Sequence, residues 1–147
     1  MVISGIVETG KRLGRTIGFP TANIRTDPTG GSRAQNGVYA AAIWLEGESG
    51  ARPCMLNQGS HPTVPDGKPT IEAHLLDFSG DLYGRRVRVA YLHFIRPERR
   101  FDSLDALRDQ LGRDRDAVRR WLVGARAGEA SDEAGRAREI RWMPDME

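Results

Sequence analysis

The chain has 147 residues, 39% of them hydrophobic, a formal net charge of +2 and a single cysteine, Cys54. This size and composition fit one globular domain and exclude an intrinsically disordered protein, and no stretch reaches the length of a membrane span. A lone cysteine excludes an internal disulfide and fits a reducing compartment, so we expect a cytoplasmic protein without a membrane partner.

The first predicted strand, at residues 2–7, leads into a glycine-rich loop at residues 8–18. Glycines allow backbone N–H groups to approach an anion closely, and neighbouring arginines add positive charge. The loop therefore predicts an anion-binding segment that contains Gly10, Arg12, Gly14 and Arg15. A surface hairpin without a ligand is an equally good interpretation of the same residues.

The segment after this loop is stiff, because Pro20 restricts its own φ and pushes Phe19 towards an extended backbone. In a strand, Thr21 and Asn23 would lie on one side and Ala22 on the other. Two neutral oxygen ligands on one side suit a hard cation such as Mg²⁺, which keeps several waters and binds substrate phosphates. On chemistry alone, local hydrogen bonds within a turn are the favoured explanation.

Two further strands are predicted at residues 37–46 and 52–57, where apolar residues are concentrated. The second of these strands ends in a glycine-containing loop. Asn57 and Gly59 in this loop could hold a nucleotide base or a phosphate, and a plain turn without a ligand is the alternative.

The clearest predicted strand, at residues 68–78, carries a carboxylate, Glu72, near its middle. One face is apolar and consists of Ile71, Ala73 and Leu75. Glu72 lies on the opposite face with His74, which we take as structural because no third metal ligand is found for it. On general grounds a cross-strand partner for an arginine is the favoured role of Glu72, and a positioned general base is the functional alternative.

The last predicted strand, at residues 86–94, is followed by the turn IRPERRF and a helix. Phe101 in this turn offers either an aromatic face to a ligand or a hydrophobic staple for the helix. Asp102 or Ser103 is expected to cap the helix. Five apolar residues at helical spacing predict a stripe that faces the core: Leu104, Leu107, Leu111, Val118 and Leu122.

Gly112 interrupts this stripe, so one helix and two short helices, the second starting at Asp114, fit the sequence equally well. Residues 124–147 are small and charged without a clear period, and we expect either a loose tail or a short docked helix. The expected organisation is thus one domain at residues 1–123 and a tail at 124–147.

About six short strands followed by a helix indicate a small, mainly antiparallel β-barrel. Four segments carry a family resemblance: GRTIGFPTANI (14–24), NQGSHPT (57–63), IEAHLLDFSGDLYG (71–84) and IRPERRFDSLDAL (95–107). In this order they resemble the blocks of the riboflavin kinase (flavokinase) family. The resemblance runs from about Gly5 to about Leu122 and implies a six-stranded antiparallel Greek-key barrel with a C-terminal helix.

The resemblance also implies roles for individual residues. Glu72 matches the catalytic base of the family, and Thr21 and Asn23 match its Mg²⁺ ligands, with Zn²⁺ or Mn²⁺ as alternative ions. Contacts to ATP are implied for Gly10, Arg12, Gly14, Arg15, Pro20, Thr21, Asn57 and Gly59, and contacts to the flavin for Arg96, Glu98 and Phe101. The sequence departs from the family pattern at Gln58, where an apolar residue is more common, and its loop at 8–18 is short for the family's flap.

The implied reaction converts riboflavin and ATP into FMN and ADP. No HxGH nucleotidyltransferase motif is present, so we expect the chain to stop at FMN unless it is a fragment of a bifunctional FAD synthetase. A flavin- or nucleotide-binding module without turnover is the main alternative. Arginines and acids alternate, as at residues 113–116, so we expect no nucleic-acid partner. We also expect a monomer.

Overall fold

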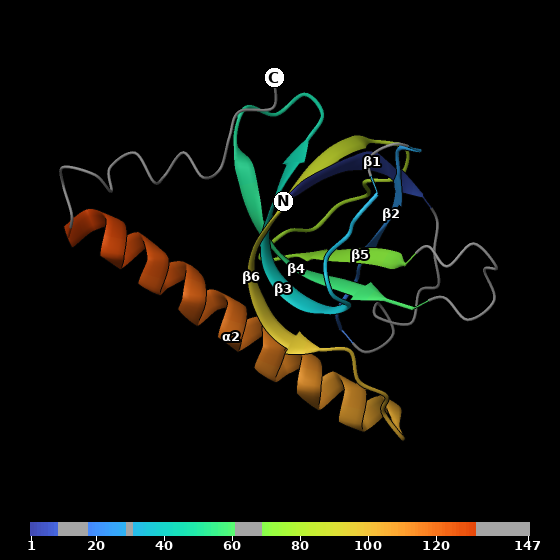
Figure 1. The fold of residues 1–147 in the computed structure, drawn as a ribbon, viewed down its shortest axis with the longest axis vertical. Coiled ribbons are helices and arrows are strands. Elements are labelled where there is room, and N and C mark those ends of the chain that lie inside the picture. The colour runs from blue at the N-terminus through green and yellow to red at the C-terminus, as the bar shows by residue number, and fades with distance from the viewer. Residues whose placement is uncertain (9–17, 29–30, 61–68, 132–147) are drawn as a thin grey trace.

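The computed structural model describes residues 1–8, 18–28, 31–60 and 69–131. Within these residues, six antiparallel strands close into a barrel, and one long helix crosses its outer surface (Figure 1). The strands are β1 (Val2–Glu8), β2 (Ala22–Thr26), β3 (Gly37–Leu45), β4 (Ala51–Gly59), β5 (Thr70–Leu75) and β6 (Arg86–Pro97), and the helix is α2 (Leu104–Ser131). Around the barrel the strand order is β1-β2-β5-β4-β3-β6. The predicted six-stranded antiparallel barrel with a C-terminal helix is confirmed.

Side chains that alternate along each strand build the interior of the barrel. On β5, Ile71, Ala73 and Leu75 are buried inside, whereas Glu72 and His74 are half-buried on the outer face, as the sequence pattern predicts. Cys54 is fully buried in the same core and behaves as a small apolar side chain. Burial raises the pKa of its thiol to about 12, so the nucleophilic thiolate is strongly disfavoured.

The outer face of β3 is covered as well as its inner face, which explains why the whole strand is buried. Tyr39 and Ala41 face the interior, whereas Val38 and Ala40 belong to a second apolar cluster that includes residues of α2. The helix packs against β3, β4 and β6 and so covers one side of the barrel (Figure 1).

α2 is a single continuous helix, and Gly112 does not divide it into two. Ser103 caps its N-terminus, because the Ser103 hydroxyl accepts a hydrogen bond of 3.0 Å from the backbone N–H of Ala106. Only part of the predicted apolar stripe reaches the core. Leu104 is 47% exposed, so its assignment to the core was wrong. The first turn of α2 lies beyond the end of β6 and, among the described residues, has no strand to pack on (Figure 1). Three residues of the predicted stripe pack in the apolar cluster between the helix and the barrel: Leu111, Val118 and Leu122.

The helix runs to Ser131 and so continues past residue 123, where the sequence pattern placed the start of the tail. Residues 132–147 lie outside the described part of the chain, and the division into a domain and a tail stays a prediction. Among the described residues, no helix is both long enough and apolar enough to cross a membrane.

Candidate active site

Three polar side chains lie in one row across neighbouring strands on the outer face of the barrel. Glu72 of β5 is the register partner of Asn23 on β2 and of Asn57 on β4. Side chains of directly opposed residues in an antiparallel pair lie on the same face, with Cβ atoms about 4.5–5.5 Å apart. The inward neighbours of this row are the core residues Ala22, Ala73 and Leu56. The sheet therefore brings together three residues that are far apart in the sequence.

Thr21 joins this row from the residue before β2. Its Oγ1 donates a hydrogen bond of 3.1 Å to Oε1 of Glu72. Neither register partner of Glu72 is an arginine, and the described residues contain no ion pair to this carboxylate. The cross-strand ion pair favoured on general grounds is therefore not the arrangement of Glu72 in the part of the chain that the structure describes.

The donor atoms of this row suit a hard cation. Thr21 offers a hydroxyl, Asn23 an amide oxygen and Glu72 a carboxylate, and Thr21 and Glu72 are in direct contact. Oxygen ligands of this kind are preferred by Mg²⁺, which binds proteins through few side chains and keeps waters and substrate phosphates. The residues present thus fit a divalent metal beside the carboxylate.

The residues just before Thr21, from Gly18 to Pro20, are held by contacts with α2 and β5. Phe19 is 6% exposed and packs in the cluster beneath α2, where the guanidinium of Arg115 lies 5.3 Å from the centre of its ring. Gly18, just before it, has a φ of +89°, a conformation that favours glycine. The next residue, Pro20, has its carbonyl oxygen 2.8 Å from Nδ1 of His74.

A second polar cluster lies where β6 leads into α2. Arg96 donates from Nε and Nη2 to both carboxylate oxygens of Asp114 at 2.8–3.0 Å, and its Nη1 donates to the carbonyl of Pro97 at 3.0 Å. The Arg96 guanidinium also lies 5.6 Å from the ring centre of Phe101. The side chain of Arg96 is 16% exposed and that of Asp114 only 2%, so this ion pair is largely shielded from water.

Glu98 connects this second cluster to the loop that follows β4. Its carboxylate accepts a hydrogen bond of 2.9 Å from the backbone N–H of Ser60. At Gly59, a Cβ atom would lie 2.9 Å from the same carboxylate, so a larger residue would displace Glu98. The segment predicted to contact ATP therefore meets the turn predicted to contact the flavin.

Gln58, the residue that departs from the family pattern, lies inside the barrel and is 1% exposed. Its Oε1 accepts hydrogen bonds from Ser32 Oγ at 2.6 Å and Tyr91 Oη at 2.8 Å. Its Nε2 donates to the Ala34 carbonyl at 2.8 Å and to Asn36 Oδ1 at 3.2 Å. The polar side chain is tolerated in the core because both ends of its amide are satisfied.

The predicted site residues thus divide into three groups. Thr21, Asn23, Glu72 and Asn57 form the row, with Pro20 leading into it. The second cluster contains Gly59, Arg96, Glu98 and Phe101. Gly10, Arg12, Gly14 and Arg15 lie outside the described residues.

Three residues that contact these groups were not assigned to the site from the sequence: Phe19, His74 and Asp114. The position of His74 two residues after Glu72, on the same face of the strand, was the one available signal.

The closed barrel thus brings a hydroxyl, an amide and a carboxylate together on its outer face, at Thr21, Asn23 and Glu72. The riboflavin kinase model of the flavokinase family matches residues 1–122. The chain therefore belongs to the riboflavin kinase family. Members of this family are generally dependent on a divalent metal.

Two relatives illustrate the range of this family. The bifunctional riboflavin kinase/FMN adenylyltransferase of Escherichia coli K12 is 43% identical over 124 residues, which is 82% of this chain and 37% of that protein. The RNA-binding riboflavin kinase RibR of Bacillus subtilis is 36% identical over 148 residues, which is 99% of this chain and 62% of that protein. The chain thus spans well under half of the length of the bifunctional relative.

Solved structures agree with the fold. The riboflavin kinase of Trypanosoma brucei matches with a TM-score of 0.61 and 30% identity over 82% of this chain and 78% of that one. A Streptococcus pneumoniae protein described as a macrolide-efflux protein matches with a TM-score of 0.72 and 34% identity over 82% of this chain and 38% of that one.

Proposed function

We propose that this chain is a riboflavin kinase, which transfers the γ-phosphoryl group of ATP to the ribityl 5′-hydroxyl of riboflavin and yields FMN and ADP. Family membership supports the substrates and the reaction. The observation that carries the assignment of the site is the contact between Thr21 and Glu72, with Asn23 opposite Glu72 in the sheet.

In this proposal Glu72 is the general base. Its carboxylate orients the 5′-hydroxyl and takes the hydroxyl proton as the oxygen forms a bond to the γ-phosphorus. The bond between the γ-phosphorus and the bridging oxygen breaks at the same time, and ADP leaves with the electron pair of that bond. Because the transition state of phosphoryl transfer is loose, positioning and electrostatics supply most of the acceleration.

Thr21 and Asn23 hold the divalent metal in this proposal. Their oxygen atoms suit Mg²⁺ or Mn²⁺ better than Zn²⁺, which prefers nitrogen and sulfur ligands, and Mg²⁺ is the ion we propose. When bound, such an ion neutralises the charge on the ATP phosphates. Asn57 and Gly59 would contact the nucleotide from the end of β4, together with Gly10, Arg12, Gly14, Arg15 and Pro20.

The second cluster supplies the flavin contacts in this proposal. Phe101 offers an aromatic face, and Glu98 offers carboxylate oxygens beside Ser60. Because Asp114 and the Pro97 carbonyl already occupy the guanidinium of Arg96, we assign Arg96 to holding the turn in place beside the flavin.

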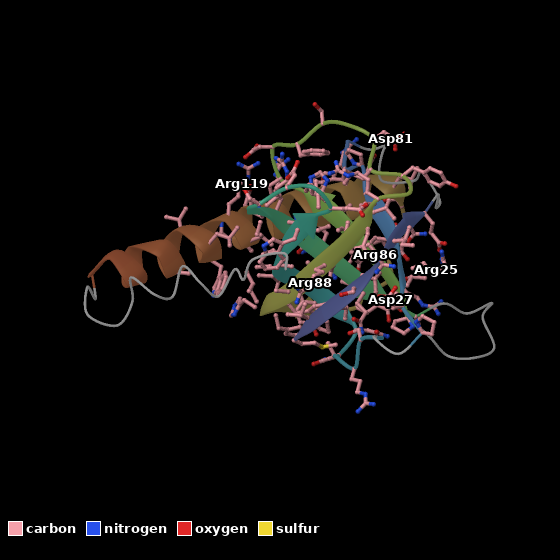
Figure 2. The ribbon with its side chains drawn as sticks, turned by 90° about the horizontal axis from the view of Figure 1, so that it is seen from above. Arg25, Asp27, Asp81, Arg86, Arg88 and Arg119 are labelled. Carbon is pink, nitrogen blue, oxygen red and sulfur yellow. The ribbon has the colours of Figure 1, made fainter. Side chains whose placement is uncertain are left out.

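The proposal includes a monomer that needs no nucleic acid. Three arginines on the barrel and helix are paired with carboxylates: Arg25 with Glu8 at 3.1 Å, Arg86 with Asp27 at 3.0 Å and Arg119 with Asp77 at 2.9 Å. Figure 2 shows Arg86 beside Asp27, with Arg119 of α2 well separated from them. Such pairing leaves less charge for phosphate contacts, and salt-sensitive binding of RNA would contradict this part of the proposal.

The direct test is the formation of FMN from riboflavin, ATP and Mg²⁺ by the purified chain, with the flavins separated by chromatography. Tight binding of riboflavin without FMN under any triphosphate or cation would instead support a binding module without turnover.

A further inference from the structure

Thr21 occupies a position that the β-ladder alone does not fix. The pairing of β2 with β5 begins at Ala22 and Ala73, one residue after Thr21. Yet the Thr21 hydroxyl donates to Glu72 at 3.1 Å, and such a contact requires a defined backbone position. Contacts outside the pairing of β2 with β5 must therefore fix the backbone of Thr21.

The His74 side chain contacts the backbone of Pro20, the residue before Thr21. The register of β2 with β5, continued by one residue, would place His74 opposite Thr21. The His74 ring instead reaches Pro20, with Nδ1 at 2.8 Å from the Pro20 carbonyl oxygen. A carbonyl oxygen can only accept a hydrogen bond, so Nδ1 must carry a proton and donate it. Both the neutral Nδ1–H tautomer and the imidazolium meet this requirement.

Fixing the Pro20 carbonyl also fixes the start of Thr21. The carbonyl oxygen of Pro20 and the Cα atom of Thr21 lie in one rigid peptide plane. The φ angle of Pro20 is restricted by its ring, and the preceding Phe19 is anchored in the cluster beneath α2. The Phe19 and His74 rings also pack together, with centroids 5.4 Å apart. The Pro20–Thr21 peptide plane is thus held at the Pro20 carbonyl by His74 and on its N-terminal side by the packing of Phe19.

We propose that His74 is a positioning residue that holds the Pro20–Thr21 peptide so that Thr21 stays in contact with Glu72. Its importance for turnover rests on the proposed riboflavin kinase function. The hydrogen bond itself does not depend on that function, so the two can be tested separately.

The kinetic test compares two substitutions in the full chain. His74→Asn keeps an amide N–H near the place of Nδ1, whereas His74→Leu removes the donor. Loss of a partner that orients a metal ligand typically costs about 10–100-fold, and we expect His74→Leu to lower kcat/KM for MgATP by this amount. The KM for riboflavin should change far less, and His74→Asn should recover most of the loss. A wild-type response of His74→Leu to limiting Mg²⁺ would overturn the proposal.

His93→Leu is the matched control. His93 is an exposed histidine on β6 whose ring stacks on Trp121 of α2, with centroids 5.0 Å apart. Its loss should affect thermal stability slightly and leave the MgATP kinetics unchanged. An equal kinetic loss in His93→Leu and His74→Leu would show a general structural effect and would contradict a positioning role.

The structural test is the protonation of the His74 ring, measured by ¹H–¹⁵N correlation of ¹⁵N-histidine at alkaline pH, where free imidazole is neutral. The chain has three histidines, so single substitutions assign the signals. We expect a protonated Nδ1 and an unprotonated Nε2 for His74. The opposite tautomer would overturn the proposal even if His74→Leu failed to fold. If the wild type formed no FMN, the proposed function would fail and this measurement would still decide whether His74 holds Pro20.

Discussion

The ion pair between Arg96 and Asp114 connects the end of β6 to the middle of α2. Asp114 accepts from Nε and Nη2 of Arg96 and also from Nε2 of Gln110 at 2.8 Å. Replacing Asp114 with Asn keeps the size and one acceptor of the side chain but removes its charge. Arg96, with a side chain 16% exposed, would then remain as a largely buried cation without a counter-charge.

The expected cost follows from this burial. Removing one partner of a buried ion pair destabilises a protein by about 3–5 kcal/mol. We expect the lower end, about 3 kcal/mol, because the Asn oxygen still accepts one hydrogen bond and water still reaches part of Arg96. For a domain of this size such a loss lowers the Tm by roughly 10 °C.

Urea and thermal unfolding of the full chain measure this loss. Asp116→Asn is the matched control, because Asp116 lies two residues further along the same helix and is 57% exposed beside Arg115 at 3.8 Å. Exposed pairs of this kind contribute about 0–1 kcal/mol. The double variant Arg96→Met/Asp114→Leu should regain most of the stability, because replacing both charges leaves neither one uncompensated. A loss below about 1 kcal/mol in Asp114→Asn, equal to that of the control, would refute the reasoning.

Three further predictions concern the core and the site. Gln58→Leu should lower the free energy of unfolding by about 1–3 kcal/mol in urea titrations, because it leaves the hydroxyl of the half-buried Tyr91 without its acceptor, and an unchanged midpoint would contradict this. Burial raises the pKa of the Cys54 thiol from 9.0 to about 12, so the folded chain keeps a proton that the unfolded chain loses. This contribution to stability is complete below pH 9 and is lost between pH 9 and 12, so Cys54→Ala should lose less stability on passing from pH 9 to 10, and equal slopes would argue against it. Asn23→Ala should raise the Mg²⁺ concentration needed for half-maximal turnover with the riboflavin KM little changed, and an unaltered Mg²⁺ dependence would remove Asn23 from the metal site.

The strands of the barrel were predicted well, because the alternation of apolar and polar residues along a strand is a local property of the sequence. Alternation of apolar and polar residues assigned Ile71, Ala73 and Leu75 to the interior and Glu72 to the outer face, and both faces are as predicted. The same period placed Thr21 and Asn23 on one side. The contact of Thr21 with Glu72 also requires β2 and β5 to be neighbours in the closed barrel, and this pairing was not predicted from the sequence.

Features that depend on tertiary contacts could not be read from the sequence. Gly112 lowers local helix propensity, yet α2 stays continuous because packing on the barrel outweighs a cost of about 1 kcal/mol. Asp114 looked like the cap of a second helix, but it is buried against Arg96 on another element. Gln58 departs from the family pattern, and the sequence does not reveal its hydrogen-bond partners. The closed barrel brings these partners to Gln58 from the segment before β3 and from β6.

In the proposed reaction Glu72 removes the proton from the ribityl hydroxyl. The most direct measurement compares FMN formation by the wild type and by Glu72→Gln under saturating riboflavin, ATP and Mg²⁺. Gln keeps the size of the side chain and can still accept from Thr21, but it cannot act as a base at neutral pH. We expect kcat to fall by about 10²–10⁴-fold with an unchanged melting temperature. Turnover at the wild-type rate in Glu72→Gln would contradict the assignment of Glu72 as the base.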